Sequence, residues 1–190
     1  ILNINTLLLN GDLNINQYAT FNTNNLNLSL TGNFTNNGIF TSGTTDVTTF
    51  NGVTQALVGN NTTFCNLAIN PATSVTLQAS SNINVNKELR ILSGNLIDGG
   101  NIITVKGNLI NYTAHISSNA ASGGILLQGT LNQVISGNGS ATPAYFGRLE
   151  IDNGAGALLQ QDVTINNALT LTSGSVNIDD QLLTIGTNAV

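Results

Sequence analysis

Carboxylates are the most numerous ionisable side chains in this chain. Paired Asp or Glu side chains hydrolyse polysaccharides when the fold groups them on one face. Here the acids are scattered, at Asp12, Asp46, Glu88, Asp98, Glu150, Asp152, Asp162, Asp179 and Asp180. The only adjacent pair, Asp179 and Asp180, follows an apolar pair and matches neither a calcium repeat nor an EF-hand loop. We interpret it as a solvated turn.

The single histidine, His115, lacks the cysteine or histidine companions of a metal site. A nucleophilic triad would need Ser117 or another serine, with His115 and an acid, brought together by the fold. No Gly-x-Ser-x-Gly elbow supports such a triad. Cys65, the only cysteine, cannot form an internal disulfide and is expected to be a small buried residue. We therefore expect no catalytic, cofactor-binding or metal-binding residue, and no enzyme activity.

Two clusters mix charges of both signs. "NKELR" holds Lys87, Glu88 and Arg90, and "GRLEI" holds Arg148 and Glu150. Residues two apart on a strand share a face. We interpret both clusters as surface ion pairs, each worth under about 1 kcal/mol, rather than as an acid or anion site. The same charges would also oppose edge-to-edge aggregation.

The composition excludes several partners. Only 7% of residues are charged, the net charge is −5, and about 32 asparagines replace the missing charge. Nucleic-acid binding depends on Lys and Arg at phosphates, so we expect no nucleic-acid partner. No apolar run approaches the roughly 18–20 residues of a membrane span. With 41% hydrophobic residues the chain is expected to fold rather than stay disordered.

The elements that position these groups are short strands. Apolar pairs split by one polar residue recur every six to eight residues, the pattern of half-buried strands. Every third pair is about 20 residues on, as from Leu67 to Leu89, Val75 to Leu96, Ile83 to Ile103, Leu149 to Leu169, Ala157 to Val176 and Val163 to Leu183. Three strands per coil, stacked at about 4.8 Å, predict a parallel β-solenoid of about nine coils and roughly 45 Å. Ordinary hairpin turns are the alternative.

Glycine and asparagine mark the predicted corners. "GDL" at 11–13, "GNF" at 32–34 and "GNL" at 94–96 and 107–109 place Gly before Asn or Asp and an inward apolar residue. Gly supplies the positive φ that a corner needs. We expect the Asn amides to form ladders along the stack.

A longer repeat of about 80 residues relates 54–110 to 132–190 and is predicted to span four coils. It matches Gln55 with Gln133 and Phe64 with Phe146, which argues that both rings lie in the core. Leu2 and Ile4 already follow the pattern, and so do Leu183 and Ile185. We expect residues 1–190 to be one continuous solenoid domain cut from a longer repetitive protein.

Segments 111–124 and 137–147 break the pattern, and the second contains Pro143. Loops that leave a rigid scaffold are common binding sites. A length-tolerant turn without function is the alternative.

Strings such as "TQALVGNNTTFCNLAIN", "NQVISGNG" and "LTLTSGSVNIDDQLLTIG" resemble repeats of very large secreted surface proteins of Bacteroidota. That group includes gliding-motility adhesins exported by the type IX secretion system. The resemblance covers residues 54–190 clearly and 1–53 loosely. It implies an extracellular location and a right-handed parallel β-helix that forms a stalk or fibre.

We expect a structural or adhesive segment of a secreted cell-surface adhesin. Its expected partners are external surfaces or polysaccharide, the secretion and anchoring machinery, and flanking repeats of the same chain. The alternatives are a carbohydrate-active β-helix enzyme or tailspike-like polysaccharide-binding module, and tandem β-sandwich modules.

Overall fold

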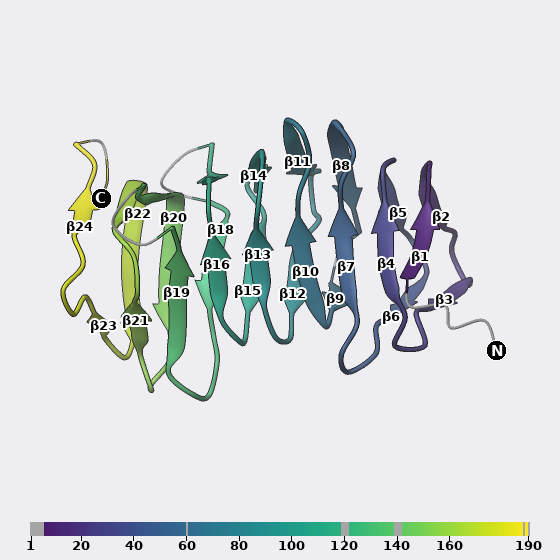
Figure 1. Ribbon diagram of the computed structural model, residues 1–190. Coiled ribbons are helices and arrows are strands. Elements are labelled where there is room, and N and C mark those ends of the chain that lie inside the picture. Colours follow the sequence, from purple (N-terminus) through teal and green to yellow (C-terminus); the bar gives the residue numbers. More distant parts are fainter. Residues whose placement is uncertain (1–5, 60, 119–121, 139–141, 188, 190) are drawn as a thin grey trace.

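The structure is a computed structural model that describes residues 6–59, 61–118, 122–138, 142–187 and 189. These residues form 24 strands and no helix. All recorded strand pairs are parallel, and the coils stack along one axis with β1 and β24 at opposite ends (Figure 1). The predicted β-solenoid is confirmed. Leu2 and Ile4, in the first predicted pair, lie outside the described residues.

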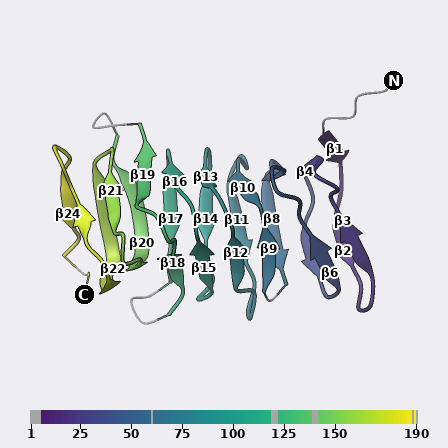
Figure 2. The same ribbon diagram turned by 90° about the horizontal axis from the view of Figure 1, so that it is seen from below.

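The solenoid has three faces, and most coils contribute one strand, or one part of a long strand, to each of them (Figure 2). Face 1 is a nine-stranded sheet, one strand per coil: β1 (Thr6–Leu9), β4 (Asn27–Leu30), β7 (Val47–Phe50), β10 (Asn66–Ile69), β13 (Leu89–Ile91), β16 (Leu109–Asn111), β19 (Gln133–Gly137), β21 (Ala157–Leu159) and β23 (Val176–Asn177). Face 2 comprises β2 (Leu13–Ile15), β5 (Phe34–Asn36), β8 (Thr54–Val58), β11 (Ser74–Leu77), β14 (Asn95–Ile97), β17 (Ala114–Ile116), the first parts of β20 (Ala144–Asp152) and β22 (Val163–Ser173), and β24 (Leu183–Ile185). Face 3 comprises β3 (Thr20–Asn22), β6 (Ile39–Thr41), β9 (Thr62–Phe64), β12 (Ile83–Val85), β15 (Ile102–Val105), β18 (Gly124–Leu127) and the second parts of β20 and β22.

The predicted register is confirmed residue by residue. Leu67 pairs with Leu89, Val75 with Leu96, Ile83 with Ile103, Leu149 with Leu169, Ala157 with Val176 and Val163 with Leu183. Like residues therefore stack over like residues, and they form one continuous apolar core.

Strands β20 and β22 differ from the predicted pattern of separate short strands. The pairs that begin at Val163 and Leu169 lie in one strand, β22, which runs across two faces. Its register against β20 shifts between Phe146 and Arg148 and again after Ile151. A bulge can re-aim a strand without breaking it, so this corner needs no turn.

Inward residues of the last coil are more exposed than their partners one coil earlier. Leu171 is 53% exposed and Ile185 is 49% exposed, whereas Ile151 and Ile165 are fully buried. Among the described residues, no further coil stacks on Leu171 and Ile185, so these two side chains are exposed although the alternating pattern points them inward.

The 80-residue repeat is one strand short of four coils. Gln55 lies on β8 of face 2, and its match Gln133 lies on β19 of face 1, eleven strands later. The four-coil prediction was therefore wrong. Strands of all three faces have the same alternating pattern of inward apolar residues. The second copy of the repeat can therefore begin on a different face from the first, and its apolar residues still point into the core. Phe64 and Phe146 are both fully buried, as predicted, although on different faces.

The corner glycines act in two ways. Gly94 has a φ of 60°, as the turn prediction requires. Gly107 lacks a positive φ, but a Cβ there would lie 2.1 Å from the carbonyl oxygen of Lys87 in the coil below. Close stacking of coils, rather than turn conformation, therefore selects glycine at Gly107, which corrects the prediction for this position.

Corner asparagines bond to backbone rather than to one another in the recorded contacts. Asp12 Oδ1 accepts the Asn33 N–H at 2.7 Å, and Asn33 Oδ1 accepts the Ala56 N–H at 2.8 Å in the next coil. Asn108 Oδ1 accepts the Val134 N–H in the same way. These side chains replace strand hydrogen bonds where the chain turns, which corrects the predicted amide-to-amide ladder.

Candidate functional site

The most chemically active group of side chains lies inside the solenoid, where two inward columns change from apolar to polar. On face 2, Val75 and Leu96 are followed in the column by His115, which pairs with Leu96. One step further along the strands, Asp98 and Ser117 continue the column of Leu57 and Leu77. The alternating sequence pattern did not reveal that Asp98 points inward.

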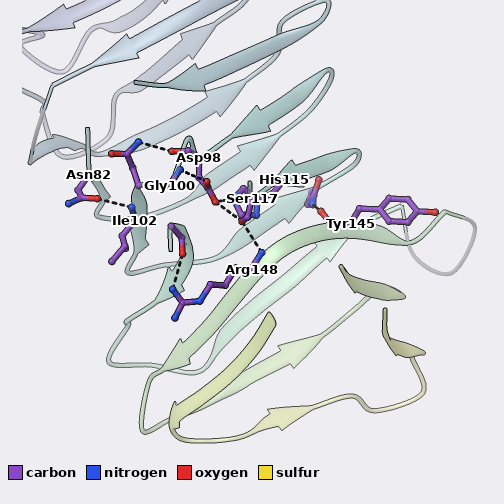
Figure 3. Close-up of polar contacts among 11 residues, drawn as sticks. Asn82, Asp98, Gly100, Ile102, His115, Ser117, Tyr145 and Arg148 are labelled. Atoms are coloured by element: carbon purple, nitrogen blue, oxygen red, sulfur yellow. Dashed lines mark hydrogen bonds and ion pairs between the residues drawn. The ribbon is translucent and has the colours of Figure 1, made fainter. Parts of the chain in front are cut away.

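Asp98, His115 and Ser117 form a sealed polar cluster (Figure 3). Their exposed fractions are 0%, 1% and 6%. Ser117 Oγ donates to Asp98 Oδ2 at 2.5 Å, and His115 Nε2 lies 3.2 Å from the same oxygen. The Gly100 N–H donates to Asp98 Oδ1 at 2.8 Å. Asp98 therefore joins its own turn to the next coil, which carries both His115 and Ser117, through one carboxylate.

The surroundings of Asp98 favour its ionised form. Burial by itself raises the pKa of the carboxyl group, but the contact with His115 and the hydrogen bonds from Ser117 and the Gly100 N–H outweigh burial, and the net pKa is lowered. A carboxylate with several donors keeps its charge in the core. The cluster is thus an ionised group held by the fold.

The cluster brings together the triad candidates but in an order that does not activate a nucleophile. A serine nucleophile needs its hydroxyl on the imidazole, which takes the proton. Here the Ser117 hydroxyl donates to Asp98, and Ser117 Oγ accepts the Arg148 N–H at 2.9 Å. Neither ring nitrogen of His115 has a recorded hydrogen bond in the described part of the chain, although Nε2 lies 3.2 Å from Asp98 Oδ2. The arrangement suits fixing the backbone rather than acyl transfer.

Both predicted charge clusters form ion pairs on the outside of the solenoid. Glu88 pairs with Arg90, and Arg148 Nη2 lies 3.2 Å from Glu150 Oε2. Arg148 Nη1 also donates to the Gly123 carbonyl at 3.1 Å. Arg148 thus ties β20 to the segment before β18.

Other sequence candidates lie apart from the cluster. Cys65 is buried as predicted, and burial is the main cause that raises the pKa of its thiol, with the charge of Lys87 opposing and that of Asp46 adding. Asp179 and Asp180 lie in an exposed turn, as predicted. A thiol with a raised pKa is a poor nucleophile at neutral pH.

The segments predicted as loops hold strands in part. Segment 111–124 contains β17 with His115, and 137–147 ends in the first residues of β20. The described parts of these segments are therefore not continuous loops, and the hypothesis that they bind a ligand stays a prediction. Residues 119–121 and 139–141, in the middle of the two segments, lie outside the described residues.

The side chains of three buried glutamines join neighbouring backbone segments by hydrogen bonds, and we call each of them a staple. The sequence analysis did not predict this role. Gln55 Nε2 donates to the Leu30 carbonyl, one coil below, while its Oε1 accepts the Gly52 N–H at 2.7 Å. Gln133 repeats these contacts with the Val105 carbonyl and the Gly129 N–H, and Gln161 Nε2 donates to the Asn111 and Ser136 carbonyls. The match of Gln55 with Gln133 in the long repeat was the signal that could have found these two, whereas Gln161 has no glutamine match.

Among the described residues, no group of three or more His, Cys, Asp or Glu side chains is placed to hold a metal ion. The part of the chain that the structure describes contains no helix long and apolar enough to cross a membrane. In comparisons with known proteins, no family model, no curated protein and no solved structure matches this chain significantly.

Proposed function

We propose that this chain is a stiff structural segment, a stalk or fibre section, of a secreted bacterial cell-surface adhesin. The observation that supports the proposal most is the unbroken parallel stack of nine strands on face 1, whose backbone hydrogen bonds run along the long axis. Such a stack gives a rod rather than a hinge, since the strands of faces 1 and 2 pair from each coil to the next along the described chain.

The side chains support the same role. Side chains of buried glutamines and corner asparagines form hydrogen bonds with the backbone of neighbouring coils. The Asp98 cluster joins coil segments in the core rather than presenting groups to a substrate. The sequence resemblance to repeats of Bacteroidota surface proteins adds the proposed extracellular location, type IX export and a role in gliding motility or attachment.

Cell labelling tests this proposal. Antibodies raised against the purified chain should label intact cells of the organism that encodes it, and Fab fragments should reduce attachment to glass or gliding over it. Labelling that requires permeabilised cells would contradict the location. Surface labelling without any effect of the Fab fragments would leave the rod a spacer and contradict the adhesive role.

A further inference from the structure

A cavity of about 360 Å³ opens on the outside of the corner between faces 3 and 1. Three successive turns form it, after β12, β15 and β18. From Val85 to Leu89 and from Val105 to Leu109 the corner takes four residues, whereas the equivalent step from Leu127 to Ile135 takes eight. The longer third turn makes one wall of the cavity, and the two short turns make the other.

Gln133 holds the two walls together. Its Oε1 accepts the Gly129 N–H of the long turn at 2.7 Å, and its Nε2 donates to the carbonyl oxygens of Val105, at 3.0 Å, and Gly107, in the short turn. The side chain is 2% exposed. A cavity whose walls are fixed in advance loses little conformational entropy when it binds.

The cavity gathers positive charge in an acidic chain. Lys87 and Lys106 both line it, from neighbouring coils that stack about 4.8 Å apart. They are two of the four cations in a chain of net charge −5. The two arginines are paired with glutamates, and no ion pair is recorded for either lysine in the described chain. Glu88 also lines the cavity, but its charge is matched by Arg90.

The remaining lining suits hydroxyl-rich ligands. Asn108 uses its Oδ1 on the Val134 N–H, which leaves an amide donor, and Asn132 uses its Nδ2 on the Ala155 carbonyl, which leaves an acceptor. Leu131 lies on the rim and is 78% exposed, so it offers an apolar surface to the C–H face of a sugar ring. The lining contains no aromatic side chain on which a nucleobase could stack.

We propose that this corner cavity binds an acidic polysaccharide, with Lys87 and Lys106 on its carboxylate or sulfate groups and the asparagines on its hydroxyls. The site adds a ligand to the proposed rod and does not rest on the rod's location or export. A nucleic acid is a poorer fit, because two lysines neutralise few phosphates.

Titration calorimetry on the purified chain tests the site with three probes: polygalacturonate for carboxylates, dextran sulfate for sulfates, and neutral dextran. We expect saturable binding of at least one acidic probe, weaker binding at high salt, and none of neutral dextran. The preferred acidic probe identifies the anionic group. Absence of saturable binding of both acidic probes would overturn the proposal, and so would equal binding of single-stranded DNA.

Three variants localise the binding. Lys87→Gln/Lys106→Gln should weaken it at least about tenfold, whereas Lys87→Arg/Lys106→Arg should retain it. A charge-relocated variant adds Gln78→Lys and Gln160→Lys, at exposed positions on other corners, to the double glutamine variant and restores the net charge. Wild-type affinity in the relocated variant would overturn the site. Circular dichroism confirms that each variant folds, and the cell-labelling test stands or fails separately.

Discussion

His115 Nε2 lies 3.2 Å from Asp98 Oδ2, and both side chains are fully buried in columns that hold leucine one coil below. The pair replaces two apolar side chains of a solenoid core with an acid and an imidazole. Removal of one partner from a buried pair costs about 3–5 kcal/mol, whereas replacement of both by apolar residues is often neutral.

This relationship predicts a strongly non-additive double-mutant cycle. Asp98→Leu and His115→Leu should each lower the free energy of unfolding by about 3 kcal/mol or more, because each takes a contact away from a polar partner that stays buried. The double variant should lose clearly less than the sum, since it restores the leucine columns. Denaturation by urea measures all four proteins. Additive losses would show that the two side chains do not interact.

Asp98 also predicts a dependence of stability on pH. Its folded pKa is lowered, so its contribution is present above the unfolded value, about 3.9, and is lost as the pH falls through the folded value below that. The groups that face it are His115, Ser117 and the Gly100 N–H.

The matched comparison uses Asp98→Asn and, as control, Asp179→Asn in the exposed turn. At pH 7 the wild type should have a higher free energy of unfolding than Asp98→Asn. This difference in free energy should shrink below about pH 4, as Asp98 gains its proton. Asp179→Asn should track the wild type throughout. A gap that stays constant down to pH 2 would contradict an ionised Asp98.

The hydrogen bonds of the buried glutamines predict that loss of the side-chain amide lowers the free energy of unfolding more at Gln133 than at an exposed glutamine. Gln133→Met keeps the volume but leaves the Gly129 N–H and the Val105 and Gly107 carbonyls without this partner. We expect a loss of about 2–3 kcal/mol in the free energy of unfolding. Gln160→Met, at an exposed position, should change it by less than about 0.5 kcal/mol. Equal losses for both variants would argue against the staple.

Much of the fold was predictable because alternation and stacking obey one simple rule. An inward residue every second position, repeated every 20 residues, fixes both the strand and its neighbour, so pairs such as Val163 with Leu183 followed from spacing alone. The rule does not distinguish the three faces. The 80-residue repeat was therefore assigned to whole coils although it falls one strand short.

The polar groups were harder to place because their roles depend on the coil below. Asp98 follows an apolar pair as Asp179 does, yet Asp98 is buried beside His115 and Asp179 is exposed. Lys87 and Lys106 are 19 residues apart, and only the register brings them to one corner. Sequence spacing predicts which coil a residue is in, but contacts between turns of different length require the structure.

Gly99 and Gly100 separate two reasons for glycine at a corner. Both have a positive φ, 59° and 84°, but a Cβ at Gly99 would lie 2.1 Å from the Leu77 carbonyl oxygen, whereas the nearest atom at Gly100 is 3.6 Å away. Asp179, matched to Gly99 by the repeat, has a φ of 48°, so the turn itself accepts a side chain.

Gly100→Ala should therefore cost only the strain of a left-handed residue, about 1 kcal/mol in the free energy of unfolding. Gly99→Ala should cost about 1–3 kcal/mol more, because the coil below has to move. Gly11→Ala, with no positive φ and no atom within 4 Å, is the matched control and should be close to neutral. Thermal or urea unfolding ranks the three variants. Equal costs at Gly99 and Gly100 would mean that turn conformation, and not the spacing between coils, selects glycine at this corner.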